Sequence, residues 1–215
     1  MIIKYQNIEL ESIKHNHIEQ IRNWRNLESI QNKMICREYI TTSQQAHWFQ
    51  NVVDENKLFF LCKVDNKPIG VIYSDDIDWK QKISYNSGVF LAENDIYGTG
   101  YPILISILFT YCGFKFNIKE NIVKILNNND NAINFNKSMG YVLKEEFQYY
   151  SLFSLKKEDF YNSISKYPKE LKITDDIELC LEKTKIDSFI QKILKEENID
   201  SSSHFKIISL DSKKQ

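Results

Sequence analysis

The chain of 215 residues has only six glycines and three prolines. Because these two residue types interrupt helices and strands, their scarcity indicates that most of the chain lies in regular elements. No apolar run reaches the length of a membrane-spanning helix, and the first ten residues, MIIKYQNIEL, lack a signal-peptide pattern. We therefore expect a cytoplasmic protein that does not insert into a membrane.

Cysteine pairs and an excess of charge are also missing. The formal net charge is −1, which argues against a protein that binds nucleic acid through bulk phosphate neutralisation. His15 and His17 have no further ligand nearby in the sequence, so we predict no metal site. The four cysteines form no CxxC motif and are expected to be reduced thiols: Cys36, Cys62, Cys112 and Cys180.

The most informative stretch is Ile83–Phe114, in which a β-type run is followed by a turn containing Gly98 and Gly100 and by a helical run from Pro102. A strand, a glycine turn and a helix N-terminus can together bind an anion, because backbone N–H groups and the helix dipole converge there. The alternative interpretation is a tight strand–helix connection without a ligand, since short glycine motifs are weak signals.

Hydrophobic residues make up 42% of the chain, enough for a sizeable core, and their spacing predicts alternating elements. We expect a strand at 2–10, a helix over 13–24, a second helix capped by Thr41 or Thr42, strands at 58–64, 69–73 and 83–91, a helix over 102–115, a strand at 122–126, a helix over 132–138, and strands at 141–145 and 148–155.

The composition shifts near Lys156, and we divide the chain into a domain of residues 1–163 and an extension of residues 164–215. In the extension, apolar residues at helical spacing predict an amphipathic helix at about 184–196, and Phe205–Leu210 fits a short strand. We expect the extension to pack on the main domain or on the partner subunit of a homodimer.

Two motifs in register identify a family. Asp95–Gly100 matches the pattern Gln/Arg-x-x-Gly-x-Gly/Ala, and Asn129–Ala132 followed by Gly140 and Tyr141 matches a second pattern, Asn-x-x-Ala with a later Gly-Phe/Tyr. With the order of helices and strands, these motifs resemble the GNAT family of acetyl-CoA-dependent N-acetyltransferases over residues 2–157.

The resemblance implies a mixed α+β GNAT fold: a mostly antiparallel twisted sheet, helices on both faces, a V-shaped splay between the fourth and fifth strands, and here a C-terminal helical appendage. Acetyl-CoA would be the co-substrate, with its pantetheine arm paired to the fourth strand like a substitute strand and its pyrophosphate on the glycine turn. The residues implied in this binding are Val89, Phe90, Leu91, Tyr97, Gly98, Thr99, Gly100, Tyr101, Asn129, Ala132 and Asn136.

The motifs depart from the family at two positions. Asp95 stands where the family has Gln or Arg, and we expect its carboxylate to face outwards, away from a pyrophosphate. Asn136 stands where the family often has the tyrosine that protonates the departing thiolate. An amide cannot act as a general acid at neutral pH but can donate a hydrogen bond to sulfur, so protonation by water, Tyr141 or Ser138 stays open.

The early segment narrows the substrate. Two branches of the GNAT family resemble this segment in Trp24-Arg25-Asn26, in Met34 and in the stretch from Ile40 to Phe49. Enzymes of one branch acetylate nucleotide-linked amino deoxysugars in bacterial surface-glycan synthesis. Enzymes of the other branch acetylate the N-termini of ribosomal proteins. We favour the amino-sugar branch and keep the protein N-terminal enzymes as the alternative. Gln45 stands where related sequences often have His. The residues that we expect at the acceptor are Arg25, Asn26, Met34, His47, Tyr73 and Tyr85.

Acetyl transfer requires a neutral amine, a polarised carbonyl and a departing thiolate. The sequence offers five groups as a base, each with the alternative role of a solvated surface group or cap: Glu93, Asp75, Asp76, Asp78 and His47. Glu93, Asn136 and Tyr141 are our candidate catalytic residues. Because Asp95 and Asn136 depart from the family, a GNAT-shaped protein that binds coenzyme A without catalysis is a further alternative.

Overall fold

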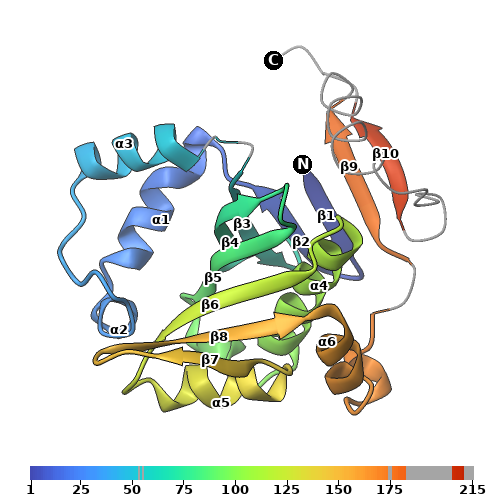
Figure 1. Ribbon diagram of the computed structural model, residues 1–215. Helices are drawn as coiled ribbons and strands as arrows, with labels where there is room; N and C mark the ends of the chain where they lie inside the picture. The colour runs from blue at the N-terminus through green and yellow to red at the C-terminus, as the bar shows by residue number, and fades with distance from the viewer. Residues whose placement is uncertain (53, 55, 174–175, 183–204, 211–215) are drawn as a thin grey trace.

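One sheet organises the residues that the computed structural model describes, which are 1–52, 54, 56–173, 176–182 and 205–210 (Figure 1). Its strand order is β10-β9-β1-β2-β3-β4-β5-β6-β8-β7. The strands are β1 (Ile2–Tyr5), β2 (Ile8–Ser12), β3 (Leu58–Val64), β4 (Lys67–Asp78), β5 (Ile83–Leu91), β6 (Glu120–Leu126), β7 (Val142–Glu146), β8 (Tyr150–Lys156), β9 (Glu178–Glu182) and β10 (Lys206–Leu210). The helices are α1 (Ile18–Arg25), α2 (Glu28–Gln31), α3 (Thr42–Val52), α4 (Tyr101–Lys115), α5 (Asp130–Ser138) and α6 (Lys157–Ile164), with 3-10 turns η1 (His15–His17), η2 (Asn94–Ile96) and η3 (Lys169–Leu171).

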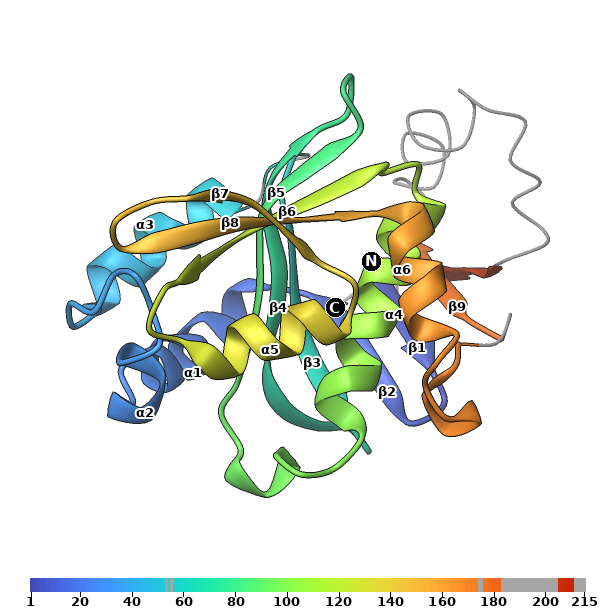
Figure 2. The same ribbon diagram turned by 60° about the horizontal axis from the view of Figure 1, so that its bottom comes forward.

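Helices cover both faces of the sheet, as predicted. The main core lies on the face of α4, whose residues from Leu104 to Cys112 are buried all around the helix. The second, smaller core lies on the face of α1 and α3 and includes Trp24 from α1 and Phe90 from β5. Neighbouring residues of one strand serve the two cores in turn, Phe60 the first and Leu61 the second, as the alternation of a strand requires. Figures 1 and 2 show α1–α3 grouped together, apart from α4.

The central hairpins confirm the sequence prediction closely. Asp65 and Asn66 have φ angles of 50° and 64°, the left-handed pair that a two-residue hairpin turn requires. The helix from Thr42 is closed by a reciprocal cap, in which Thr41 Oγ1 accepts from the Gln44 amide at 3.2 Å and Gln44 Oε1 accepts from the Thr41 amide at 2.8 Å. Val53, expected on the inner face of this helix, lies outside the described residues.

Other expectations need correction. Residues 2–10 form two strands rather than one, because Gln6 adopts a φ of 53° and turns the chain back on itself. The helix expected from residue 13 begins only at Ile18, after the 3-10 turn η1. β4 continues through the acidic stretch to Asp78, where we expected a loop. The elements α2, α6 and β9 were not predicted.

The C-terminal extension completes the same sheet. β9 pairs antiparallel with β1, and β10 pairs parallel with β9. Ile177, Leu179 and Phe205 contribute side chains to the main core, so the expectation that the extension packs on the main domain is confirmed for this part. The helix predicted at about 184–196 lies outside the described residues, and the division at residue 163 stays a prediction. No helix in the described part of the chain is long and apolar enough to cross a membrane.

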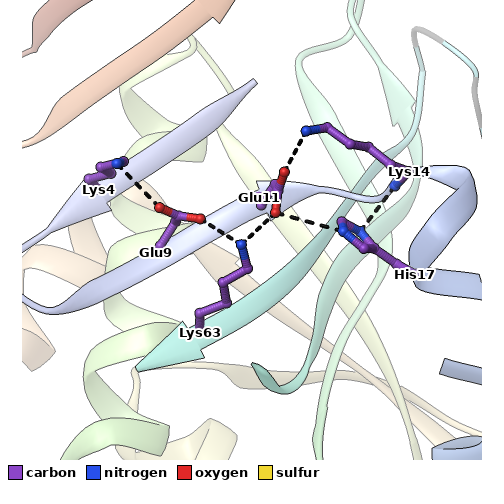
Figure 3. A network of polar contacts seen from close by, with 6 residues as sticks. All are labelled: Lys4, Glu9, Glu11, Lys14, His17 and Lys63. Atoms are coloured by element: carbon purple, nitrogen blue, oxygen red, sulfur yellow. Dashed lines mark hydrogen bonds and ion pairs between the residues drawn. The ribbon is translucent and has the colours of Figure 1, made fainter. Parts of the chain in front are cut away.

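Charged side chains cross-link β2 and β3 on the face away from α4 (Figure 3). Lys63 contacts Glu9 at 2.8 Å and Glu11 at 2.6 Å, and Lys14 reaches the other oxygen of Glu11 at 2.6 Å. The Nε2 atom of His17 lies 3.8 Å from Glu11. Burial alone would raise the pKa of Glu11, but hydrogen bonds from the two lysines lower this pKa to about 2. The network therefore holds a buried carboxylate in its charged form where η1 meets the sheet.

Candidate active site

The strands β5 and β6 part after a short pairing. They are hydrogen-bonded in parallel at three positions only, ending at Tyr85 and Ile122. Beyond this point β5 keeps its antiparallel partner β4 as far as Leu91, whereas β6 remains paired with β8. The predicted V-shaped splay is therefore confirmed, and one backbone edge of the second half of β5 has no strand beside it among the described residues.

A kink in β5 lies at the point of divergence. Asn86 has a φ of 52°, a left-handed conformation that asparagine tolerates better than most residues. The hydroxyls of Ser84 and Ser87 are 2.9 Å apart although residues three positions apart face opposite ways in a regular strand, and Ser84 also meets Ser74 at 2.6 Å. The kink thus reverses the alternation, so that Phe90 points to the α1 and α3 face.

The glycine turn has the geometry of an anion site, with fewer free amides than expected. Gly98 has a φ of 89°, and a side chain added there would meet nothing within 4 Å. The amides of Thr99 and Tyr101 are already bonded inside the turn, to Ile96 O and to Thr99 Oγ1, each at 3.3 Å. The amides of Gly98 and Gly100 have no acceptor among the described residues, so these two fit a diphosphate at the start of α4.

The residues around this turn hold it in place. The hydroxyl of Tyr97 donates to the carbonyl of Leu91 at 3.0 Å, which ties the turn to the end of β5. Asp95 faces outwards, as expected, with its side chain 76% exposed and one oxygen 4.0 Å from Lys67. The ammonium of Lys33 lies 5.5 Å from the ring centroid of Tyr97. Lys33 was not predicted, and the polar run around it carries no motif that could have identified it.

A pocket of about 340 Å³ lies between the chain after α2 and the turn from β6 to α5. Its lining is almost entirely polar: Asn32, Lys33, Leu126, Asn128, Asn129, Asp130 and Asn131. Asn129 begins α5, and its side-chain oxygen accepts from the Ala132 amide at 3.1 Å. The side chain of Asn129 thus caps the helix, and its contact with pantetheine stays a prediction.

The candidate acids for the thiolate are mostly occupied. Asn136 donates from its side-chain nitrogen to the carbonyl of Ala132 at 2.8 Å, which leaves it one further N–H. The Ser138 hydroxyl donates to Phe135 O at 2.7 Å and lies 3.0 Å from the hydroxyl of Tyr167. Tyr141 is buried in the main core, and this burial raises its pKa well above its usual range. The position of Tyr141 therefore counts against it as the acid.

Two of the candidate bases have cationic partners. Glu93 forms an ion pair with Lys67 at 2.6 Å, and Asp75 forms one with Lys57 at 3.0 Å. Both carboxylates already bind an ammonium, so these contacts disfavour a role as base.

The other three candidates are more accessible. Asp78 accepts from the Gln81 amide at 2.8 Å and caps a turn. Asp76 is exposed and lies opposite Tyr85 in the pairing of β4 with β5. His47 is exposed on α3, where the neighbouring Gln45 is buried, so it faces away from the sheet.

The α1 and α3 face of the splay carries a cation, Arg25, that has no ion-pair partner among the described residues. The guanidinium of Arg25 lies 6.0 Å from the ring centroid of Phe90, and no acidic partner is found for it among the described residues. Its Nε atom is buried without a hydrogen-bond acceptor there. The Tyr73 ring covers Gly88, since a Cβ added to Gly88 would lie 2.7 Å from the Tyr73 hydroxyl. Burial raises the pKa of Tyr73, and the charge of Arg25 opposes this shift.

Two expected acceptor residues have contacts that support the fold, and their role at the acceptor stays a prediction. Asn26 donates to the Ile40 carbonyl at 2.9 Å and accepts from the Ile40 amide at 2.8 Å, so its side chain holds the segment before α3 against the end of α1. Met34 is partly buried against the second core. Tyr85 is half-buried beside the point of divergence, where our expectation stays open.

The family follows from comparison with known proteins. Residues 10–153 match the acetyltransferase (GNAT) domain, and the chain belongs to this family. It is therefore an N-acetyltransferase that uses acetyl-CoA. A search of curated protein sequences finds no match.

Several solved structures share the fold at low sequence identity. The ribosomal L7/L12 alpha-N-protein acetyltransferase RimL, solved with coenzyme A, is 15% identical with a TM-score of 0.63, covering 73% of this chain and 98% of its own. Spermidine N-acetyltransferase from Vibrio cholerae, solved with coenzyme A and spermine, is 14% identical with a TM-score of 0.65, covering 73% and 99%. Aminoglycoside acetyltransferase AAC(6')-Ib, solved with coenzyme A, is 13% identical with a TM-score of 0.62, covering 73% and 98%.

Proposed function

We propose that the protein acetylates the amino group of a nucleotide-linked amino deoxysugar, in the synthesis of a bacterial surface glycan in the cytoplasm. The observation that carries this proposal is Arg25, a partly buried cation on the α1 and α3 face of the splay that has no ion-pair partner in the described part of the chain. A guanidinium in this position is suited to a phosphate oxygen of the nucleotide, which it can bind through two N–H groups. The aromatic residues beside it, Phe90 and Tyr73, exclude water and strengthen that contact.

The reaction forms one C–N bond and breaks one C–S bond. The neutral amine attacks the thioester carbonyl, and the amine loses one proton while the departing sulfur gains one. The free amides of Gly98 and Gly100 hold the diphosphate of the donor, and the open edge of β5 aligns the donor arm with the attacking amine. Asp76, exposed and opposite Tyr85, is the best placed of the candidate bases. The remaining N–H of Asn136 is available for the departing sulfur.

The similar structures suggest other acceptors. Two of them act on spermidine and on aminoglycosides, which are polycations and would be repelled by Arg25. The third acts on a protein N-terminus, and this remains our alternative because a peptide can bring a carboxylate to Arg25.

Thiol release from acetyl-CoA tests the proposal directly. The panel contains nucleotide-linked 4-amino sugars, short N-terminal peptides, spermidine and an aminoglycoside. Turnover on an amino sugar supports the proposal, whereas turnover on peptides alone would replace it with the alternative. Tight calorimetric binding of coenzyme A without turnover on any of these amines would show that the acceptor is not in the panel and would overturn the proposed substrate.

The Arg25→Met variant tests the cation itself. We expect KM for the nucleotide sugar to rise about ten- to hundredfold, the range for a lost hydrogen bond to a charged group, while the Kd for coenzyme A stays unchanged. Arg37→Met is the matched control, because Arg37 is exposed and bonds only to the Met34 carbonyl in the described part of the chain. Equal effects of the two variants would show that Arg25 does not bind the acceptor.

A further inference from the structure

Gln45 is a buried side chain whose amide nitrogen has no hydrogen-bond acceptor among the described residues. It is 3% exposed, and its Nε2 atom is buried completely. Buried amides in native proteins nearly always have partners, so such a donor calls for a specific explanation. The Nε atom of Arg25 is the second side-chain nitrogen with this property.

Both donors belong to the same corner of the molecule. The bonds from Asn26 to the backbone of Ile40 fix the start of α3 beside the end of α1, where Arg25 lies. Gln45 is therefore in the part of α3 that is nearest to this anchor. Figure 1 shows α1 and α3 side by side, and the two helices pack against one another.

The inner face of α3 leads from Gln45 to the sheet. Trp48, one turn further along the helix on the same face, contacts Phe59 edge-on with ring centroids 5.4 Å apart. Phe59 in turn stacks on Tyr73 at 5.0 Å, and the Tyr73 ring covers Gly88 on β5. Gln45 thus lies on the face of α3 that packs towards the second core, the core that also contains Phe90, the ring below Arg25.

The side-chain groups that lack a partner in the described part of this corner are hydrogen-bond donors. The two nitrogen atoms without an acceptor among the described residues, Nε of Arg25 and Nε2 of Gln45, are both donors. The nearby side chains of the second core are apolar: Ile21, Trp24, Ile30, Leu61, Val71 and Phe90. Donors in an apolar setting favour a ligand group with several oxygen atoms and a negative charge, and disfavour an ammonium.

We propose that Gln45 determines acceptor specificity by donating, together with Arg25, to a phosphate oxygen of the acceptor substrate. This inference rests on the proposed function and adds a residue and a direction of discrimination to it. In place of a histidine, which could take up a proton, the glutamine amide stays neutral and keeps its donor at all pH values.

The variants Gln45→Met and Gln45→Glu test this role with the full-length protein. Methionine keeps the shape and removes the donor, so KM for a nucleotide 4-amino sugar should rise about five- to fiftyfold while the Kd for coenzyme A is unchanged. Because the buried amide nitrogen has no acceptor in the part of the chain that the structure describes, the melting temperature of Gln45→Met should stay the same or rise. Gln45→Glu adds a negative charge and should weaken this acceptor more than methionine does. Gln50→Met, an exposed position on the same helix, is the matched control and should leave all these values unchanged.

Each outcome has a meaning of its own. An unchanged acceptor KM in Gln45→Met, with an active enzyme, would overturn the role of Gln45 and leave the proposed function intact. Tighter acceptor binding in Gln45→Glu would overturn it as well, because it would show a cationic group at this position. Loss of melting temperature in Gln45→Met would show that the amide stabilises the fold. If wild-type protein turned over no nucleotide sugar at all, the proposed function itself would fail. Competition by inorganic pyrophosphate, weakened in both Arg25→Met and Gln45→Met, would support the anion contact independently of the sugar.

Discussion

The carboxylate of Glu11 offers a quantitative test of how the N-terminal strands are held. It is 7% exposed and receives hydrogen bonds from Lys14 and Lys63, each at 2.6 Å. Its pKa is about 2 in the folded protein, compared with 4.5 for a free side chain. At about 1.4 kcal/mol per pH unit, this difference corresponds to about 3 kcal/mol of stability at neutral pH. A group with a lowered pKa stabilises the fold above its unfolded value, so the contribution falls as the pH decreases from about 4.5 towards 2.

The Glu11→Gln variant should therefore lose about 3 kcal/mol in free energy of unfolding at pH 7 and about 1.5 kcal/mol at pH 3, measured by urea denaturation. Glu19→Gln is the control, since Glu19 forms an exposed pair with Arg22 at 2.9 Å and should change stability by less than about 1 kcal/mol. An equal loss for Glu11→Gln at both pH values would refute the reasoning, because the effect would then come from packing and not from charge.

Substitutions at two glycines, Gly98 and Gly88, test the proposed donor and acceptor sites. Gly98→Ala meets no atom but is strained by a φ of 89°, so we expect a loss of about 1–2 kcal/mol in stability and weaker binding of coenzyme A by calorimetry. Gly113→Ala is the control, since it lies within α4 with open space around it and should leave that binding unchanged. Gly88→Ala would place a methyl group 2.7 Å from the Tyr73 hydroxyl and displace that ring, raising the acceptor KM without changing the Kd for coenzyme A. An unchanged acceptor KM in Gly88→Ala would remove Tyr73 from the acceptor site.

The parts of the fold that the sequence predicted well are those with local signals. The hairpin at Asp65 and Asn66, the reciprocal cap of Thr41 and the helix start near Pro102 are each specified by adjacent residues. The unpredicted strand β9 depends on a partner, β1, that lies far away in the sequence, and its five residues carry no turn signal of their own. Short strands of this kind are decided by tertiary pairing rather than by pattern.

In the candidate site too, the features with a local sequence motif could be predicted and those that depend on tertiary contacts could not. The glycine turn could be located from its motif, but the internal use of the Thr99 and Tyr101 amides could not, because backbone bonding leaves no trace in residue identity. The residues next to Asn26 in the sequence suggested that it binds the acceptor substrate, and the structure shows that its side chain holds the backbone of Ile40. Gln45 could be recognised only as a departure from related sequences, and its unsatisfied amide became visible through burial.

These differences explain why the donor is better defined than the acceptor. The donor site that we propose relies on main-chain features, namely an open strand edge and two amides without an acceptor among the described residues, which many sequences can produce with the same fold. Structures 13–15% identical to this chain share its fold and were solved with coenzyme A bound. The acceptor side relies on side chains from α1 and α3, which such low identity does not preserve. The substrates of the similar enzymes consequently say little about this one, and the charge at Arg25 is the stronger guide to what it acetylates.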